Sequence, residues 1–124
     1  MNIVMREILF VAAGGALGSV GRYLVSKMVA TSFPWGTFAV NILGSLLIGL
    51  LTGFFNRGAL SPEMKLLFVT GFCGGFTTFS TFANESFNML KGGDVVWASV
   101  YVGSSVAVGL LAVYCGLHLA ETIK

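Results

Sequence analysis

The feature that most constrains this chain is a run of glycines and hydroxyl residues, Gly71-Phe-Cys-Gly-Gly-Phe-Thr-Thr-Phe-Ser-Thr-Phe82, inside a segment apolar enough to cross a bilayer. Lipid offers no hydrogen bonds, so non-helical backbone at that depth survives only where protein buries it or where it lines a polar cavity. A broken helix leaves free carbonyls at the end of one half, which suit a cation, and free N–H groups at the start of the next, which suit an anion. The pattern therefore predicts a transport protein whose third membrane helix is broken near residues 74–80.

The composition places the chain in a membrane. It has 124 residues, of which 56% are hydrophobic and 10% are charged, and its mean hydropathy is +0.89. A soluble domain of this size carries more charge. The basic residues are scattered singly, so we expect no nucleic-acid surface. No HExxH, GxSxG, P-loop or paired-carboxylate pattern is present, and we expect no enzyme.

Hydropathy predicts an all-α membrane protein, formed as one transmembrane domain over residues 1–124. Four segments are long enough for a hydrocarbon core of about 30 Å: residues 8–28, 35–55, 66–90 and 95–119. Glycine and serine recur in the first, second and fourth segments, and Gly14 and Gly18 have the GxxxG spacing that lets helices approach closely. These small residues predict tight helix packing and say nothing about a substrate.

The basic residues give a weak orientation signal. One side of the predicted topology holds Arg6, Arg57, Lys65 and Lys124, and the other holds Arg22, Lys27 and Lys91. An excess of Lys and Arg fixes the cytoplasmic side, so four against three permits insertion in both orientations. Since four helices enclose a pore poorly, we infer an antiparallel homodimer. The alternative is that Arg22 lies too deep to count, which leaves four against two and one fixed orientation.

Polar and aromatic residues at membrane depth are the candidate site residues. Asn41 in the second segment can donate amide hydrogens to a small anion, or it can bond a neighbouring helix. Phe76, Phe79 and Phe82 recur every three residues, a spacing that places them on one helix face. Their ring edges carry positive potential and could face an anion, although such a stripe is also typical of packing or lipid contact.

Other polar groups near the break have structural or steering roles in this interpretation. Thr77, Thr78, Ser80 and Thr81 can bond freed backbone groups and cap the second half-helix. Glu85 would repel a passing anion, so we assign it to structure or gating. Arg22 near the end of the first segment can attract anions into a vestibule, or it can anchor the helix at the interface.

These residues resemble the CrcB/Fluc fluoride channels. The resemblance is carried by Gly-Thr-Phe-Ala-Val-Asn at residues 36–41 and by Thr-Gly-Phe-Cys-Gly-Gly-Phe-Thr-Thr-Phe-Ser-Thr-Phe at residues 70–82, with Glu85 following. It covers the whole chain in length, span count and motif order. It implies a dual-topology homodimer with two antiparallel pores, through which fluoride leaves the bacterial cell passively across the inner membrane.

The resemblance also implies specific site residues. A structural sodium ion at the dimer centre would be held by the main-chain carbonyls of Gly74 and Thr77. The fluoride pathway maps onto Asn41, Phe79, Phe82, Tyr101 and Ser105, and Arg22 maps near the vestibule. Gly109 is a departure, because some relatives have a hydroxyl residue there.

Two rival hypotheses come from other classes. A small proton-coupled multidrug exporter shares the four short spans and the antiparallel dimer, but its chemistry needs an acid in the first span, where this chain offers glycines and Arg22. A purely structural subunit of a larger complex would conduct nothing alone.

Overall fold

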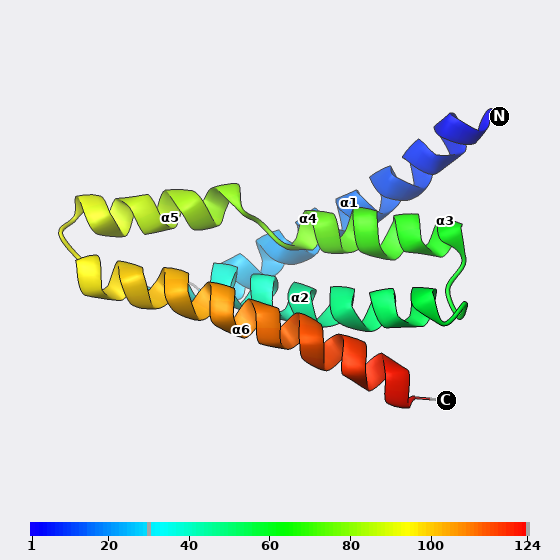
Figure 1. The fold of residues 1–124 in the computed structure, drawn as a ribbon. Coiled ribbons are helices and arrows are strands. Elements are labelled where there is room, and N and C mark those ends of the chain that lie inside the picture. Colours follow the sequence, from blue (N-terminus) through cyan, green and yellow to red (C-terminus); the bar gives the residue numbers. More distant parts are fainter. Residues whose placement is uncertain (30, 124) are drawn as a thin grey trace.

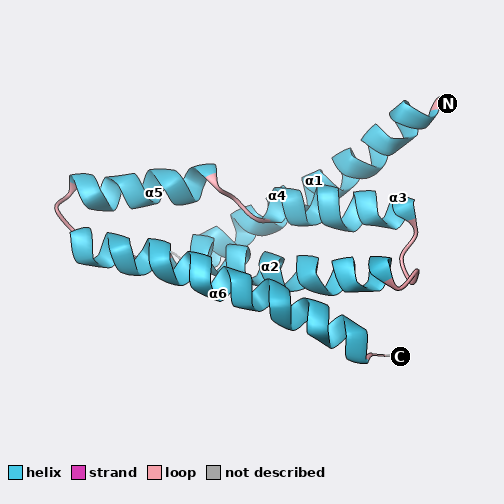
Figure 2. Cartoon of the chain, in the orientation of Figure 1, coloured by secondary structure: helices cyan, strands magenta, loops and turns pink. Residues whose placement is uncertain are grey.

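The computed structural model describes residues 1–29 and 31–123, and within these ranges all regular structure is helical (Figures 1 and 2). The elements are α1 (Ile3–Met28), α2 (Trp35–Asn56), α3 (Pro62–Lys65), η1 (Leu66–Cys73), α4 (Gly74–Phe76), α5 (Ser80–Lys91) and α6 (Val95–Thr122). Four helical stretches are long and apolar enough to cross a membrane: α1, α2, residues 62–91 and α6. The predicted all-α class with four spans is therefore confirmed. Lys124, which entered the charge count, lies outside the described residues.

The helices pack in two close pairs. α2 packs along α6, and α1 crosses η1 and α4 (Figure 1). In the first pair, a Cβ added to Gly116 would overlap the Leu46 carbonyl and lie 2.7 Å from the Leu50 amide nitrogen. In the second pair, a Cβ on Gly18 would overlap the Phe72 carbonyl oxygen. Backbones approach this closely only where a side chain is missing, so the predicted role of the small residues in helix packing is confirmed.

The third span is interrupted between α4 and α5. α4 ends at Phe76, Thr77 adopts the extended backbone conformation (φ −86°, ψ 161°), and α5 begins at Ser80. Figure 2 shows this link as a loop between two separate helices. The interruption lies within the predicted region 74–80. α5 then continues beyond the end of α4 and returns through a turn to α6 (Figure 1).

The first half of this span contains a feature that the sequence pattern did not predict. Residues Leu66–Cys73 form a π-helix, wider than an α-helix, between the short α-helices α3 and α4. Gly71 lies in this segment against α1, where an added Cβ would stand 2.8 Å from the Val11 carbonyl oxygen. Single π-turns are rare and often mark functional regions of helices.

The expected stripe of three phenylalanines on one helix face is wrong. Phe76 lies before the interruption, and its ring stacks on Phe72 with centroids 5.5 Å apart and planes 15° apart. Phe79 lies in the interruption and Phe82 on α5. Because a periodic stripe needs continuous helix, the extended backbone at Thr77 separates Phe76 from the other two rings.

Candidate functional site

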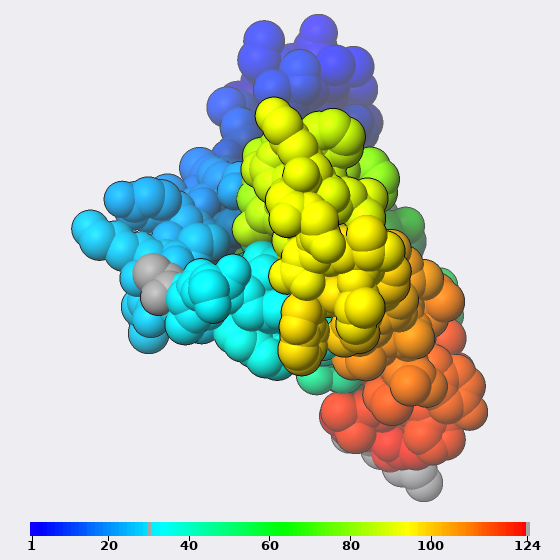
Figure 3. All heavy atoms as spheres, turned by 90° about the vertical axis from the view of Figure 1, so that its left-hand side faces the viewer, coloured from blue at the N-terminus to red at the C-terminus, as the bar shows by residue number. Residues whose placement is uncertain are grey.

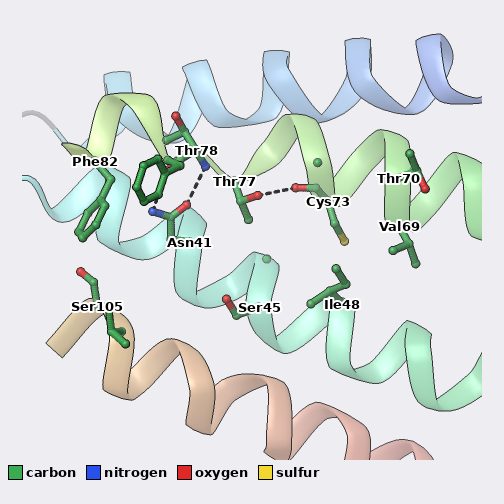
Figure 4. Close-up of a pocket in the computed structure, with 14 residues that line it drawn as sticks. Asn41, Ser45, Ile48, Val69, Thr70, Cys73, Thr77, Thr78, Phe82 and Ser105 are labelled. Carbon is green, nitrogen blue, oxygen red and sulfur yellow. Dashed lines mark hydrogen bonds between the residues drawn. The ribbon is translucent and has the colours of Figure 1, made fainter. Parts of the chain in front are cut away.

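A cavity of about 510 Å³ lies between α2, the interrupted span and α6 (Figure 4). Its lining brings together predicted site residues from α2, the interrupted span and α6: Asn41, Gly74, Thr77, Thr78, Phe79, Phe82 and Ser105. The remaining wall is largely apolar, with Ile48, Val69 and Val106 among its residues. The cavity therefore places a few polar groups and two aromatic rings in an apolar surrounding, which is typical of a binding site.

Asn41 bonds both backbone groups of one residue in the interruption. Its Nδ2 donates to the Thr78 carbonyl oxygen at 3.0 Å, and its Oδ1 accepts from the Thr78 N–H at 2.8 Å (Figure 4). The amide thus replaces the helical partners that Thr78 lacks, which is the condition for non-helical backbone away from water. Nδ2 carries two hydrogens, and this contact uses one, so a second amide donor remains on the cavity wall.

The hydroxyl groups around the interruption divide into two kinds. Thr77 Oγ1 donates to the Cys73 carbonyl at 2.8 Å, and Thr78 Oγ1 accepts from the Thr81 N–H at 3.3 Å. The first contact bonds a carbonyl near the end of the first half-helix, and the second bonds an N–H at the start of the second half-helix, as expected for capping residues. The Ser80 and Thr81 hydroxyls, by contrast, make no hydrogen bond within the described part of the chain, so they do not cap α5.

The rings of Phe79 and Phe82 both belong to the cavity lining. Phe79 is 79% exposed on this chain, and its ring centroid lies 6.1 Å from that of Phe82. The Phe82 ring lies 5.1 Å from the ring of Tyr101, which is fully buried. Tyr101 does not line the cavity and lies behind Phe82, whereas Ser105, one turn further along α6, does line it.

Glu85 is held by hydroxyls from two other helices. Thr37 Oγ1 donates to Glu85 Oε2 at 3.0 Å, and the Tyr101 hydroxyl donates to Oε1 at 3.0 Å. Hydrogen bonds to a carboxylate are stronger than neutral ones, so these contacts join α5 to α2 and α6. Thr37 was not among the predicted site residues. The signal was present, since Thr37, Asn41 and Ser45 recur at every fourth residue and therefore share one face of α2.

Ser105 carries an unpartnered polar atom. Its Oγ is buried and has no hydrogen-bond partner among the described residues. A buried hydroxyl left without a partner costs about 1–3 kcal/mol, so such groups call for an explanation such as a bound ion or water. Figure 4 shows the Ser105 side chain extending from α6 toward Phe82 and the space beside Asn41.

Arg22 reaches the interruption from α1. Its Nε donates to the Gly75 carbonyl at 3.0 Å, so the guanidinium neutralises part of the negative end of α4. Within the described part of the chain, the carbonyl oxygens of Gly74 and Thr77 accept no hydrogen bond. Arg22 thus contacts the backbone beside the interruption, and its predicted place in a vestibule stays a prediction.

A second, smaller cavity has Glu85 in its lining. It measures about 310 Å³ and is lined by Thr31, Ser32, Pro34, Glu85, Asn88 and Met89. Glu85 thus faces this polar cavity, while its hydrogen-bond partner Tyr101 contacts Phe82 on the wall of the larger one.

Comparison with known proteins places these features in a family. The model of the family described as "CrcB-like protein, Camphor Resistance (CrcB)" matches residues 9–117. The chain is 50% identical to the fluoride-specific ion channel FluC of Bacteroides fragilis, over 97% of this chain and 100% of the relative. It is 49% identical to the FluC of Chlorobaculum tepidum, over 96% and 98% of the two chains, and 48% identical to that of Maridesulfovibrio salexigens, over the same shares.

Proposed function

The chain belongs to the CrcB family, and on this premise we propose that it is a fluoride-selective channel that exports fluoride passively across the bacterial inner membrane. The need for such a channel follows from acid–base chemistry. HF is neutral and crosses lipid, and it dissociates in the cytoplasm to an anion that cannot leave unaided. An inside-negative potential drives that anion outward with about 2.3 kcal/mol per 100 mV, so a passive path suffices.

The cavity supplies the groups that a small anion needs. The free amide hydrogen of Asn41 and the Ser105 hydroxyl can each donate to fluoride, and the edges of the Phe79 and Phe82 rings offer positive potential without a formal charge. The observation that carries the proposal is that Ser105, which lines this cavity, has a buried Oγ with no hydrogen-bond partner among the described residues. A hydroxyl that lacks a protein partner is available to replace a water of the ion's hydration shell.

Neutral donors suit conduction better than a fixed positive charge. A channel must bind its ion strongly enough to admit it and weakly enough to release it. Arg22 lies on the Gly75 carbonyl rather than in the lining, so the cavity carries no full positive charge from this side chain. Selection against chloride would follow from a narrow path and from donors spaced for the smaller ion.

Glu85 would act as a support next to the path rather than as a ligand of the ion. Its two hydroxyl contacts occupy both carboxylate oxygens and fix α5 relative to α2 and α6. The same contacts argue against the multidrug exporter, whose acid must exchange protons with a drug.

A structural sodium ion fits the end of α4. The Gly74 and Thr77 carbonyls lack hydrogen-bond partners among the described residues, and unwound carbonyls at a half-helix end are typical sodium ligands. When bound, the ion would supply positive charge that fixes these carbonyls. Two copies of the chain would contribute both pairs of oxygens.

An antiparallel homodimer would explain why the cavity wall is exposed at Phe79 on a single chain. The basic residues divide four against three between the two sides with Arg22 counted and four against two without it, and Phe79 on the cavity wall is largely exposed on one chain. A second copy inserted in the opposite orientation would cover this ring and complete the path, giving two pores per dimer.

The test is reconstitution of the purified protein in liposomes, with fluoride efflux followed by an electrode. We expect fluoride efflux driven by a potassium gradient, with chloride efflux at background and no proton-linked drug uptake. Chloride efflux as fast as fluoride efflux would reject the selectivity. Absence of any flux would favour a structural subunit.

A further inference from the structure

Phe33, in the loop between α1 and α2, contacts the residue that links Glu85 to the aromatic wall of the cavity. Its ring centroid lies 5.5 Å from that of Tyr101, with the planes at 82°, which is the edge-to-face arrangement that aromatic pairs favour. Figure 3 views this end of the molecule and shows the cyan start of α2 beside the yellow turn between α5 and α6.

The position of Phe33 is fixed by its own backbone. Its carbonyl oxygen accepts from Thr31 Oγ1 and from the Trp35 N–H, both at 2.7 Å. Pro34 follows and restricts the backbone of the residue before it to extended conformations. The Phe33 ring also contacts the rings of Trp35 at 4.7 Å and Trp97 at 6.1 Å. These hydrogen bonds and ring contacts together fix the position of the Phe33 ring next to Tyr101.

Tyr101 connects Phe33 to the proposed path in two ways. Its hydroxyl holds Glu85, and its ring lies against Phe82. The Tyr101 side chain is fully buried, so the rings around it decide which orientation it adopts. A shift of this ring would move the hydroxyl away from Glu85 and leave Phe82 without support.

We propose that Phe33 is a positioning residue for fluoride conduction: its ring fixes Tyr101, and through Tyr101 it fixes the Glu85 carboxylate and the Phe82 ring. This proposal rests on the proposed function, because its main readout is fluoride flux. Phe33 itself lines neither of the two cavities.

The experiment compares fluoride efflux from liposomes for the wild type, Phe33→Leu, Phe33→Trp and the control Phe38→Leu. Phe38 belongs to the same aromatic group but contacts Trp35 rather than Tyr101. We expect Phe33→Leu to lower the efflux rate by about tenfold, whereas Phe33→Trp and Phe38→Leu keep most of it. If Phe33→Leu does not yield folded protein, Phe33→Met carries the same test.

A double-mutant cycle separates positioning from a general packing effect. In the Tyr101→Leu background, which lacks both the hydroxyl that holds Glu85 and the ring that contacts Phe82, Phe33→Leu should lower efflux by no more than about twofold further. An equal loss in both backgrounds, or full efflux from Phe33→Leu alone, would overturn the proposal.

Nitration by tetranitromethane, mapped by mass spectrometry, tests the contact without using flux. In the wild type we expect modification of Tyr23 and Tyr114, which are 61% and 66% exposed, and protection of Tyr101. Phe33→Leu should make Tyr101 reactive, and Phe38→Leu should not. Continued protection in Phe33→Leu would overturn the proposal even if the wild type conducts fluoride. A wild type that conducts nothing would instead reject the proposed function and leave this readout valid.

Discussion

The two halves of the interrupted span are held in the molecule by different interactions. The first half, from α3 to α4, lies against α1 at backbone distance, and a Cβ on Gly75 would stand only 2.6 Å from the Gly15 carbonyl. The second half, α5, depends on the hydroxyl contacts of Glu85 and on the rings around Phe82. Close packing tolerates little change, whereas polar contacts can be removed singly. The first half is therefore held rigidly by close packing. The second half, α5, is the part of the proposed path whose position single substitutions can change.

The largest effect is expected from Gly14→Val, which disrupts the close packing of the first half against α1. The new side chain would overlap the Leu67 carbonyl, and its Cβ would lie 2.8 Å from the Phe72 amide nitrogen. We expect a destabilisation of about 3 kcal/mol or more and loss of the folded species in size-exclusion chromatography. Gly103→Ala is the control, since an added Cβ there meets nothing within 4 Å among the described residues. A folded, fully active Gly14→Val would contradict the packing described for the first half.

Asn41→Ala removes the side chain that holds the interruption between the two halves. It removes both contacts to Thr78 and leaves that residue's N–H and carbonyl unpaired. Each lost bond is worth about 1 kcal/mol, so we expect the conducting geometry to become rarer and fluoride efflux to fall by about tenfold or more. Ser45→Ala, which changes the same cavity wall without breaking a described hydrogen bond, should conduct almost normally. Equal efflux from the two variants would remove Asn41 from the account.

Glu85→Gln weakens only the contacts that hold the second half, α5. Glutamine offers one acceptor oxygen and one NH2 donor, so either the Thr37 or the Tyr101 hydroxyl loses its carboxylate acceptor and can at best accept a weaker hydrogen bond from the amide. We expect a loss of about 1–2 kcal/mol that is confined to α5. Hydrogen-exchange mass spectrometry should show faster exchange in residues 80–91 and unchanged exchange in residues 66–73. Faster exchange in both segments would mean that the halves are not independent.

Ser105→Ala gives the smallest structural effect. Since Ser105 Oγ has no partner among the described residues, its removal should leave stability unchanged or raise it by up to about 1 kcal/mol. Fluoride efflux should nevertheless fall by about threefold, because the path loses a donor. A destabilised variant with normal efflux would indicate that the hydroxyl serves the fold instead.

The sequence was sufficient to predict the parts that depend on local composition. Hydropathy located the spans, and glycines with hydroxyl residues located the interruption, because both follow from what lipid allows. The small residues of α1, such as Gly14, also indicated close packing correctly.

Contacts between distant segments could not be predicted in this way. The pairing of Asn41 with Thr78 depends on how α2 meets the interruption, and the two partners of Glu85 come from different helices. The phenylalanine stripe failed for a related reason, since a spacing of three predicts a shared face only while the helix continues. The π-helix likewise has no compositional signature that distinguishes Leu66–Cys73 from an ordinary helix.

The central claim is that the rings next to the interruption form part of the fluoride path. It is tested most directly by fluoride efflux from liposomes containing Phe79→Ile or Phe82→Ile, with assembly checked by size-exclusion chromatography. We expect each variant to elute as the wild-type species does and to conduct at least about tenfold more slowly. Full efflux from both correctly assembled variants would contradict it.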